Sequence, residues 1–526
     1  MKKKVYFVLS IISLAIMAFM SVKLPLIIQK CVDAVIEKEY IVMYDKLKIV
    51  IMLSVLTVIV AMLRVVFEVA FENAVKHELR GKLLVGLTNK KLQDFTVDEN
   101  ARYVSIFNNE IDMVYEDYYL NTVDICGCMI TALMSVTALC QINIAIGIII
   151  FTTCILIAIA PQFFKKSSQK VRMELTDNLK KYNGLLKEFL EGMSVIREYG
   201  YIKKFLSRLT GQSENINKSM TKRGRINCKV NATVIILQKI QDVMIILIGV
   251  SMIKEGNMTA GQLLAAVSLA SVMSTPITYL ASLFSIRNSV KPVVDELKQI
   301  MSIKQDKVYK QVNRINKIEL KKLSIRFEDK VVLDEVDYTF DANNKYLIMG
   351  ESGSGKSTLL KILSMEQDNY IGDVLIDGKS LANISEKDYF SHINIVHQEA
   401  FMLYDTVIEN IKMDKKLDDD IIKNVGVKLN ISDLLDKEDA TVLSGGEKQR
   451  VSLARALADV KDFIILDEVT SSLDRDNAIR VEDALLNGIG TGMINVSHKP
   501  VKELMEKYDV ILELKNGKLI ELQDKN

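Results

Sequence analysis

The sequence predicts a multidomain membrane protein, in which an all-α domain of six spans with a cytoplasmic helical stalk precedes an α/β P-loop domain. Three observations support this fold class. Residues 1 to about 300 hold long apolar runs, whereas residues from about 315 onward alternate strand and helix patterns with ordinary polarity. In the second part, Gly350–Ser357 reads GESGSGKS, which fits the phosphate-loop pattern G-x-x-x-x-G-K-[ST]. We therefore expect a transmembrane domain over residues 1–300, a linker over 301–314 and the P-loop domain over 315–526.

Six stretches are long enough to cross a hydrocarbon core, which needs roughly 20 residues at 1.5 Å each. They are residues 5–28, 49–69, 122–141, 144–163, 232–253 and 261–285. Short connections follow the third and fifth stretches, whereas the second and fourth are followed by about 50 and 65 residues. Both long connections carry apolar residues at three- and four-residue spacing, which predicts helices that extend the spans by about 30–45 Å.

The distribution of positive charge predicts the orientation in the membrane. Lys165–Lys229 holds sixteen Lys or Arg residues, and Lys2–Lys4 precede the first span. The positive-inside rule places both segments in the cytoplasm. An even number of spans returns the chain to the same side, so the α/β domain is also expected there. The formal net charge is only +2, so no charge excess indicates a nucleic-acid partner.

The phosphate loop predicts a site for nucleotide and Mg²⁺. Its glycines let backbone N–H groups converge on phosphates, and the helix that follows adds its dipole. Lys356 is expected to contact the β- and γ-phosphates, and the Ser357 hydroxyl to bind Mg²⁺. The predicted nucleotide-binding residues of the loop are Gly350, Glu351, Ser352, Gly353, Ser354, Gly355, Lys356, Ser357 and Thr358.

A second apolar strand, Phe463–Leu466, is followed directly by two carboxylates. Asp467 is expected to orient the Mg²⁺ shell. Glu468 is expected to act as general base toward the attacking water, a role that requires a carboxylate within hydrogen-bond reach of that water. An Asp-Glu pair also occurs on ordinary surfaces, but its position after a buried strand favours the catalytic interpretation.

Between these two motifs, Leu443–Arg450 reads LSGGEKQR. The three motifs in this order and spacing resemble the nucleotide-binding domain of ABC (ATP-binding cassette) transporters. The six spans that precede them resemble the exporter type of half-transporter, so the resemblance covers essentially the whole chain. It is most specific over Phe327–His498. The resemblance implies an ATP hydrolase in a cell membrane, with ATP and Mg²⁺, coupled to transport.

The resemblance also assigns roles to residues outside these motifs. Gln398, in IVHQEAF, resembles the Q-loop glutamine that contacts Mg²⁺ and water. His498, in INVSHKP, resembles the switch histidine that contacts the γ-phosphate. Ser471 and Asp474 belong to SSLD, which resembles the D-loop at the dimer seam. Phe327 lies where the family stacks an aromatic ring on adenine, although it could instead be one more strand residue that packs inward.

The signature residues imply a dimer. By resemblance, they cap the ATP that is bound to the loop of a partner chain, so one chain holds two half-sites and no complete one. The residues are Ser444, Gly445, Gly446 and Glu447. Because Glu468, His498 and the signature are all intact, a homodimer is favoured. A heterodimer with a second half-transporter is the alternative.

The connection between ATP hydrolysis and the spans is predicted at the tips of the two long helical connections. A short helix at each tip is expected to sit on a nucleotide-binding domain, with Phe95–Tyr103 and a stretch within Glu188–Tyr201 as candidates. Asp436–Val442, just before the signature, reads DKEDATV and lacks the glycines that exporters usually carry there. This departure bears on the crossed coupling route and not on ATP binding.

Five ionisable residues inside the predicted spans are candidates for a cargo site: Arg64, Glu68, Asp124, Lys239 and Asp242. At 1.5 Å per residue, all five are expected near the cytoplasmic leaflet at comparable depth. In one interpretation they line an inward-facing cavity for a charged or zwitterionic solute. In the other, the helices have already left the bilayer, and the groups pair or reach toward the headgroups.

The predicted function is ATP-driven export, by alternating access, of an unidentified solute through the lipid bilayer. Peptide, lipid-like and drug-like cargo all remain open. The alternatives are uptake by the same fold and a membrane regulatory ATPase that senses without net transport. Intact Glu468 and His498 argue against a purely structural module, which would not need hydrolytic residues.

Overall fold

The computed structural model describes residues 2–303, 309–327, 330–471, 473–488, 490–498 and 500–522. The chain forms two compact units. The first, the helical unit, comprises residues 1–88 and 102–303, and the second, the α/β unit, comprises residues 89–101 and 304–526. Part of the predicted linker, residues 304–308, lies outside the described residues.

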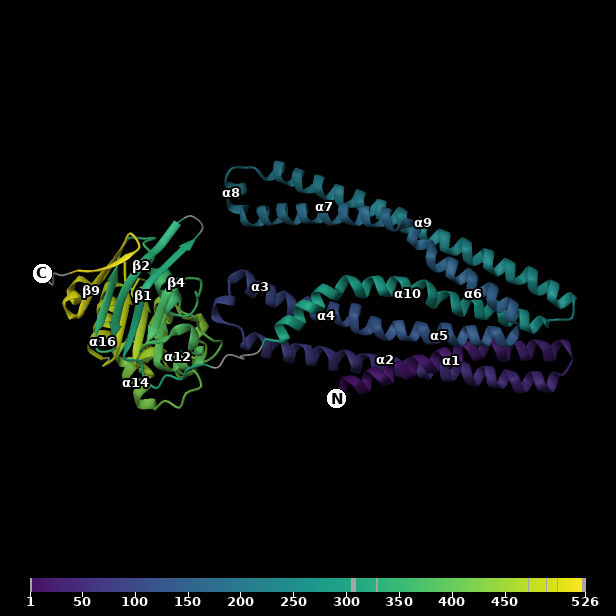
Figure 1. The fold of residues 1–526 in the computed structure, drawn as a ribbon, viewed down its shortest axis with the longest axis horizontal. Helices are drawn as coiled ribbons and strands as arrows, with labels where there is room; N and C mark the ends of the chain where they lie inside the picture. The colour runs from purple at the N-terminus through teal and green to yellow at the C-terminus, as the bar shows by residue number, and fades with distance from the viewer. Residues whose placement is uncertain are drawn as a thin grey trace. The chain divides into compact units, whose positions relative to one another are not determined.

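The helical unit consists of long helices joined by short turns (Figure 1). Its α-helices are α1 (Lys2–Ile36), α2 (Tyr40–Thr88), the end of α3 (Val97–Ser105), α4 (Ile111–Val114), α5 (Asn121–Ile142), α6 (Ile144–Ile159), α7 (Lys165–Glu191), α8 (Met193–Glu198), α9 (Ile202–Lys254) and α10 (Ala260–Met301). Two π-helical turns, Ile106–Glu110 and Tyr115–Leu120, and a 3₁₀ turn, Ala160–Phe164, continue the α-helices. Within the described residues, six helical stretches are long and apolar enough to cross a membrane. The chain is a multi-pass membrane protein.

Side-chain caps explain the short turns between spans. Asn143 begins α6 by accepting hydrogen bonds from the backbone N–H groups of Ala145 and Ile146 at 2.9 and 3.3 Å. Thr259 begins α10 with a capping box, in which its hydroxyl accepts from the Gln262 N–H at 3.1 Å and the Gln262 side chain accepts from the Thr259 N–H at 2.9 Å. These caps satisfy N–H groups that would otherwise be unpaired at the ends of the helices.

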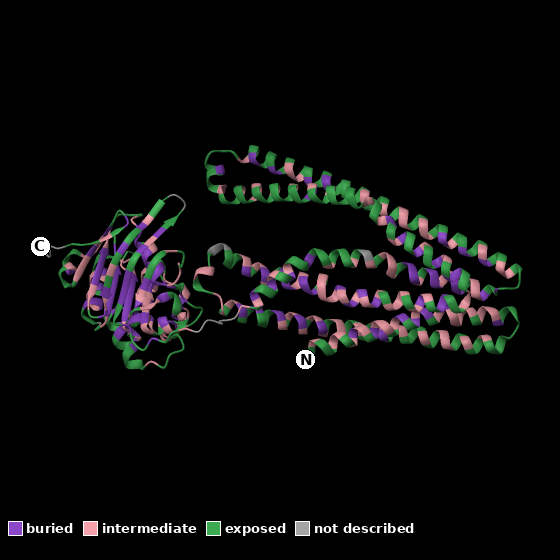
Figure 2. Ribbon diagram, viewed as in Figure 1, coloured by how far each residue is buried: buried purple, intermediate pink, exposed green. Residues whose placement is uncertain are grey.

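The burial pattern of the helical unit fits an apolar solvent. Exposed residues, green in Figure 2, recur along its long helices, and many of them are large and apolar. Leu247 on α9 is 67% exposed and Ile148 on α6 is 58% exposed. In water such surfaces are costly, whereas in a bilayer they contact lipid tails. The stalk end is different, because α7 and α9 enclose a small core of Phe189, Phe205 and Leu209 beside α8.

The α/β unit contains two sheets with helices between the strands (Figure 1). Its strands are β1 (Lys317–Phe327), β2 (Lys330–Asp341), β3 (Lys345–Met349), β4 (Ile371–Ile376), β5 (Lys379–Ser380), β6 (Ile393–Val396), β7 (Phe463–Asp467), β8 (Gly492–Val496), β9 (Val510–Lys515) and β10 (Lys518–Glu521). Its α-helices are α11 (Lys356–Leu363), α12 (Glu386–His392), α13 (Val407–Lys412), α14 (Asp419–Lys428), α15 (Gly445–Ala458) and α16 (Arg475–Gly488), together with the start of α3. The smaller sheet has the order β2-β1-β4-β5 and the larger one β10-β9-β3-β8-β7-β6.

The larger sheet separates two hydrophobic cores. Along β3, Tyr346 and Ile348 enter the core shared with the smaller sheet, whereas Leu347 enters the core beneath α13–α16. The same alternation holds for Phe463 and Ile464 on β7. Successive side chains of a strand point to opposite faces, so an apolar run buries both faces of the sheet. This burial fixes the strand ends that carry the site.

Residues 89–101 belong to the α/β unit, although they connect α2 to the rest of the helical unit. The Lys91 ammonium and the Gln93 amide both donate to the Asp368 carboxylate at 2.8 Å. The Leu92 N–H donates to the Glu386 carboxylate at 3.2 Å. These contacts begin one turn before the predicted tip, Phe95–Tyr103. The Lys91 ion pair lowers the pKa of the Asp368 carboxyl below its ordinary value.

Candidate nucleotide-binding site

The candidate site lies at the carboxyl ends of four adjacent parallel strands. β3, β8, β7 and β6 pair in parallel in that order. The phosphate loop follows β3, His498 follows β8, Glu468 follows β7 and Gln398 follows β6. In open α/β sheets, ligands bind at this edge, because loops from neighbouring strands converge there. The topology therefore brings the predicted catalytic residues to one place.

The phosphate loop adopts a conformation that requires glycine. Gly350 has φ +154° and Gly355 has φ +109°. A Cβ atom at Gly350 would lie 2.6 Å from the Leu514 carbonyl oxygen, and one at Gly355 would lie 2.9 Å from the Val332 carbonyl oxygen. A side chain at either position would displace backbone. The tight turn from β3 into α11 therefore depends on these two glycines.

Lys356 begins α11 and is only 3% exposed. Its ammonium donates to the carbonyl oxygens of Gly350 and Glu351 at 2.7 and 2.9 Å, and lies 3.4 Å from Nδ1 of His498. Burial lowers the pKa of Lys356 below its ordinary value, against the opposing influence of Glu468. The loop thus holds a desolvated cation at the helix N-terminus, where an anion is favoured.

Glu468 is held in a strained backbone conformation at the end of β7. Its φ is +48°, which for a residue other than glycine costs about 1–3 kcal/mol. Its N–H donates to the Val496 carbonyl oxygen at 2.9 Å, which locks the residue against β8. Nε2 of His498 lies 3.1 Å from one carboxylate oxygen, and the Gln398 amide donates to the other at 3.3 Å. The structure therefore brings all three predicted catalytic residues together.

These contacts form a line along the edge of the sheet. Lys356 contacts His498, His498 contacts Glu468, and Glu468 contacts Gln398. The order is that of the strands, not that of the chain. Each side chain is positioned by a different strand end. A ligand that replaces one of these contacts would therefore free a side chain that also contacts the next residue in the line.

The oxygen donors at this edge fit Mg²⁺ bound together with phosphate. Ser357 is exposed, and Asp467 at the end of β7 is partly buried. Burial raises the pKa of Asp467, and the adjacent Glu468 raises it further. A cation between the carboxylate and phosphates would offset this cost, and Mg²⁺ prefers such oxygen ligands. The buried Ser354 hydroxyl also has no hydrogen-bond partner within the described residues.

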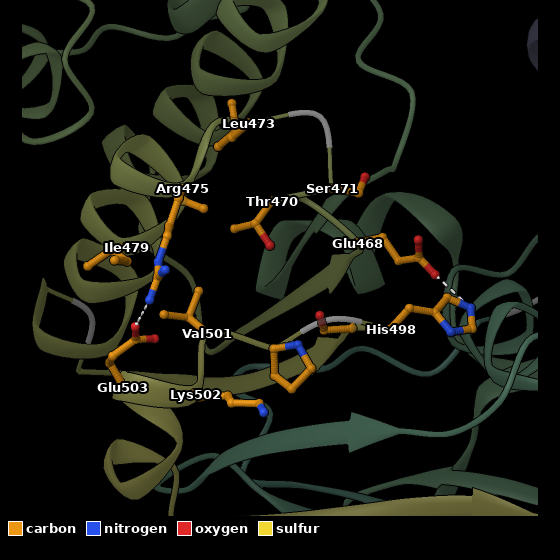
Figure 3. Close-up of a pocket in the computed structure, with 13 residues that line it drawn as sticks. Glu468, Thr470, Ser471, Leu473, Arg475, Ile479, His498, Val501, Lys502 and Glu503 are labelled. Atoms are coloured by element: carbon orange, nitrogen blue, oxygen red, sulfur yellow. Dashed lines mark hydrogen bonds and ion pairs between the residues drawn. The ribbon is translucent and has the colours of Figure 1, made fainter.

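A pocket of about 650 Å³ adjoins the catalytic pair (Figure 3). Glu468 and His498 lie on one side, and an ion pair between Arg475 and Glu503 lies on the other. The Arg475–Glu503 pair is not predicted by any of the motifs. The one available signal was that Arg475 follows the D-loop aspartate directly.

The D-loop begins at the same strand end. The Ser471 N–H donates to the Glu468 carbonyl oxygen at 3.0 Å. The Asp474 carboxylate accepts from the side-chain amide of Asn477 at 2.6 Å, which lowers the pKa of Asp474. Ser472, between them, lies outside the described residues. Ser471 thus lies beside Glu468, whereas the predicted place of Ser471 and Asp474 at a dimer seam stays a prediction.

The signature residues form the N-terminus of α15. Ser444 and Glu447 make a capping box, in which the Ser444 N–H donates to the Glu447 carboxylate at 2.8 Å. A Cβ atom at Gly445 would meet no atom within 4 Å. Within the described part of the chain, no hydrogen bond or ion pair joins Ser444–Glu447 to the phosphate loop. Ser444 and Gly445 at the start of α15 are exposed, and Gly446 is partly exposed.

Two further predictions concern residues away from the strand ends. Phe327 ends β1 and is 47% exposed, so its ring is available to a ligand. The five candidate cargo residues form two groups. Arg64 lies 3.2 Å from Asp124 and 3.7 Å from Glu68, and Lys239 lies 3.0 Å from Asp242. No ion pair among the described residues joins the two groups, and a shared cavity stays a prediction.

Known proteins resemble both parts of the chain. The family model described as "ABC transporter transmembrane region" matches residues 5–277, and the model described as "ABC transporter" matches residues 333–471. A solved structure described as a bacterial Atm1-family ABC exporter with ATP bound superposes with a TM-score of 0.82. The match covers 98% of this chain and 95% of that one, at 18% identity.

Curated relatives agree with these models. An ATP-dependent lipid A-core flippase of Pseudomonas aeruginosa is 26% identical over 390 residues, which are 70% of this chain and 62% of the relative. A probable multidrug resistance ABC transporter ATP-binding/permease protein of Bacillus subtilis is 26% identical over 374 residues, 67% of this chain and 54% of the relative. The matches thus span about three fifths or less of the relatives' length. With one family model covering half of its length and a second matching residues 333–471, the chain belongs to the ABC transporter family.

Proposed function

We propose that the chain is an exporter half-transporter, which hydrolyses ATP at composite sites of a homodimer and moves an unidentified cargo across the membrane. The line of contacts from Lys356 through His498 and Glu468 to Gln398 carries this proposal. A structural module would not need four strand ends to converge on a strained glutamate. The six apolar helices in the same chain give hydrolysis a membrane domain to drive.

The residues of the site have distinct roles in hydrolysis. The phosphate loop binds the triphosphate, and the buried Lys356 ammonium neutralises its charge. Ser357, Gln398 and Asp467 would hold Mg²⁺, which supplies charge neutralisation on the phosphates. Glu468 orients the attacking water and accepts its proton. His498 lies between Lys356 and Glu468, so it can contact the terminal phosphate while it keeps Glu468 in position.

A second copy of the chain would complete each site. The signature presents an exposed helix N-terminus with no atom within 4 Å of the Gly445 Cβ position. That surface suits the close approach of a phosphate bound to another chain. The homodimer is supported by the intact hydrolytic and signature residues. Two copies of this chain would supply every half-site, so no second type of chain is required. The alternative, a heterodimer, would use the same half-sites of this chain.

We propose that the N-terminus and the α/β unit face the cytoplasm. Lys2–Lys4 and the Lys- and Arg-rich connection 165–229 are expected on that side, and an even number of spans returns the chain to it. Export is supported by the names of the relatives, which include a lipid A-core flippase and a probable multidrug resistance transporter. The two ionic groups around Arg64 and Lys239 remain our candidates for cargo contact.

The function is tested with inside-out vesicles that contain the purified chain. A panel of fluorescent lipids, peptides and drugs should include a compound that accumulates only when ATP and Mg²⁺ are added. Glu468→Gln serves as the matched control, since it keeps the shape of the side chain and removes the base. ATPase activity without accumulation of any compound would favour a regulatory ATPase. Equal accumulation by wild type and Glu468→Gln would contradict ATP-driven transport.

A further inference from the structure

The parts of α7 and α9 that adjoin the predicted apolar spans carry only positive charge. Lys165–Arg172 reads KKSSQKVR and Lys222–Lys229 reads KRGRINCK, and together they hold eight Lys or Arg residues and no Asp or Glu. The stalk segment between them, residues 173–221, holds eight Lys or Arg and six Asp or Glu. The excess of positive charge is therefore concentrated at one end of the stalk.

The two basic stretches lie at the same level. α7 and α9 run side by side (Figure 1). Lys222 on α9 lies 2.6 Å from Glu174 on α7, and the Asn178 amide donates to the Ser219 hydroxyl at 2.9 Å. Residue numbers thus rise along one helix as they fall along the other, so residues before Glu174 face residues after Lys222. We call this set the basic collar: Lys165, Lys166, Lys170, Arg172, Lys222, Arg223, Arg225 and Lys229.

The charges of the collar are exposed and largely uncompensated. All eight residues are exposed. Apart from the pair between Lys222 and Glu174, no ion pair within the described residues joins the collar to a carboxylate. Farther along the same helices, Arg208 pairs with Glu188 at 3.9 Å, and Lys218 pairs with Glu214 at 3.0 Å. Like charges on adjacent helices repel one another, so an anionic surface beside the collar would stabilise this arrangement.

The collar adjoins the apolar surface of the spans. Lys165 directly follows the 3₁₀ turn that ends α6, in which Phe163 is 82% exposed. Lys229 comes three residues before the predicted span 232–253. At 1.5 Å per residue, all eight bases lie within about 15 Å of an apolar segment. The nearest bases, Lys165, Lys166 and Lys229, fall within the range over which a charged membrane surface acts at physiological salt, about 8–10 Å, and the farthest lie within about twice that range.

We propose that the basic collar binds the headgroups of anionic phospholipids in the leaflet beside the stalk. The proposal rests on the proposed membrane orientation and adds a specific lipid partner to it. Charge sign, exposure and distance from the spans all fit a layer of lipid phosphates. The positive charges are spread over two helices, which suits a surface with many headgroups better than one small anion.

The experiment compares two variants of the full chain in nanodiscs. The collar variant is Lys166→Gln/Lys170→Gln/Arg223→Gln/Arg225→Gln. The matched control is Lys180→Gln/Lys181→Gln/Lys203→Gln/Lys204→Gln, which removes the same charge from the distal parts of α7 and α9. Electron paramagnetic resonance of spin-labelled phosphatidylglycerol and phosphatidylcholine measures the preference of each protein for anionic lipid. Thermal unfolding confirms that both variants are folded.

The wild type and the distal control should prefer phosphatidylglycerol. The collar variant should lose this preference by about fivefold or more, since each basic side chain near an anionic surface contributes roughly that factor. Inorganic phosphate at equal charge should not displace the lipid, and displacement would indicate a free-anion site instead. Equal preference in all three proteins, or equal loss in both variants, would overturn the proposal. ATPase activity in the same nanodiscs tests the proposed function separately, because lipid preference is read without ATP.

Discussion

Separating the two halves of the composite site onto different chains tests whether the site forms between protomers. Lys356→Ala removes the ammonium of the phosphate loop, and Gly445→Asp adds a carboxylate at the start of α15. The structure predicts that both variants fold. No atom lies within 4 Å of the Gly445 Cβ position. Loss of Lys356 leaves the carbonyl oxygens of Gly350 and Glu351 without one donor, a cost of about 1–3 kcal/mol.

The two changes should be severe for function. At about 4 Å from a unit negative charge, a carboxylate is repelled by about 4 kcal/mol at the effective dielectric of a protein surface. That repulsion is close to a thousandfold in affinity, so Gly445→Asp should prevent the signature from closing on a phosphate. Each variant alone has two defective sites per homodimer and should be nearly inactive.

The assay uses purified heterodimers, isolated through two different affinity tags and measured by phosphate release. A heterodimer of Lys356→Ala with Gly445→Asp has one intact site and one doubly defective site, so it should keep about half of the wild-type activity. A heterodimer of wild type with the double variant has one defect at each site and should be nearly inactive. A site completed within one chain would reverse these two results. Near-zero activity in both would refute the independence of the two sites.

Three further predictions follow from individual side chains. Glu468→Gln should bind ATP but lose turnover by about 10²–10⁴-fold, and near-wild-type phosphate release would show that Glu468 is not the base. Burial raises the pKa of Glu482, whose carboxyl accepts from the Tyr508 hydroxyl at 2.7 Å. Neutral Glu482 stabilises the fold, and this contribution is fully present below the ordinary pKa of 4.5 and is lost as pH rises through the raised pKa. Calorimetry should therefore show that the stability of Glu482→Gln falls less steeply with rising pH than that of the wild type. If stability fell equally steeply with pH in both proteins, Glu482 would not be the cause of the decline. Neutralising Lys239 or Asp242 should change cargo-stimulated ATPase activity and spare the basal rate, whereas equal effects on both rates would argue against cargo contact.

The residues of the candidate nucleotide site could be proposed from the sequence because the chemistry restricts residue type and spacing. A phosphate loop needs glycine where Gly350 and Gly355 have positive φ, and a hydrolytic base needs a carboxylate at a strand end. The order of contacts from Lys356 to Gln398 was not predictable. It depends on the strand order β3-β8-β7-β6, which local sequence patterns do not specify. The Arg475–Glu503 pair was not predicted for the same reason, because it joins residues from two segments that only the fold brings together.

In the helical unit, each predicted span falls within one long helical stretch, but the apolar pattern missed the full extent of the helices. The span predicted at residues 49–69 lies within α2, which continues from Tyr40 to Thr88. Hydropathy marks where a helix contacts lipid, whereas the helix itself ends where capping and packing change. The tip at Phe95–Tyr103 stays a prediction. The contact at Lys91, just before it, was not predicted. It depends on Asp368, 277 residues away, and no local pattern reports such a partner.

The unbroken length of α2 has a mechanical consequence. With 49 residues at 1.5 Å each, α2 is a lever about 74 Å long. A tilt of about 5° about one end of a helix of this length moves the other end by roughly 6 Å. Only Asn89 and Lys90 separate the end of α2 at Thr88 from Lys91, whose ammonium is bound to Asp368. A small rotation of the residues that follow Thr88 would therefore be magnified into a displacement of several ångströms at the Tyr40 end of α2.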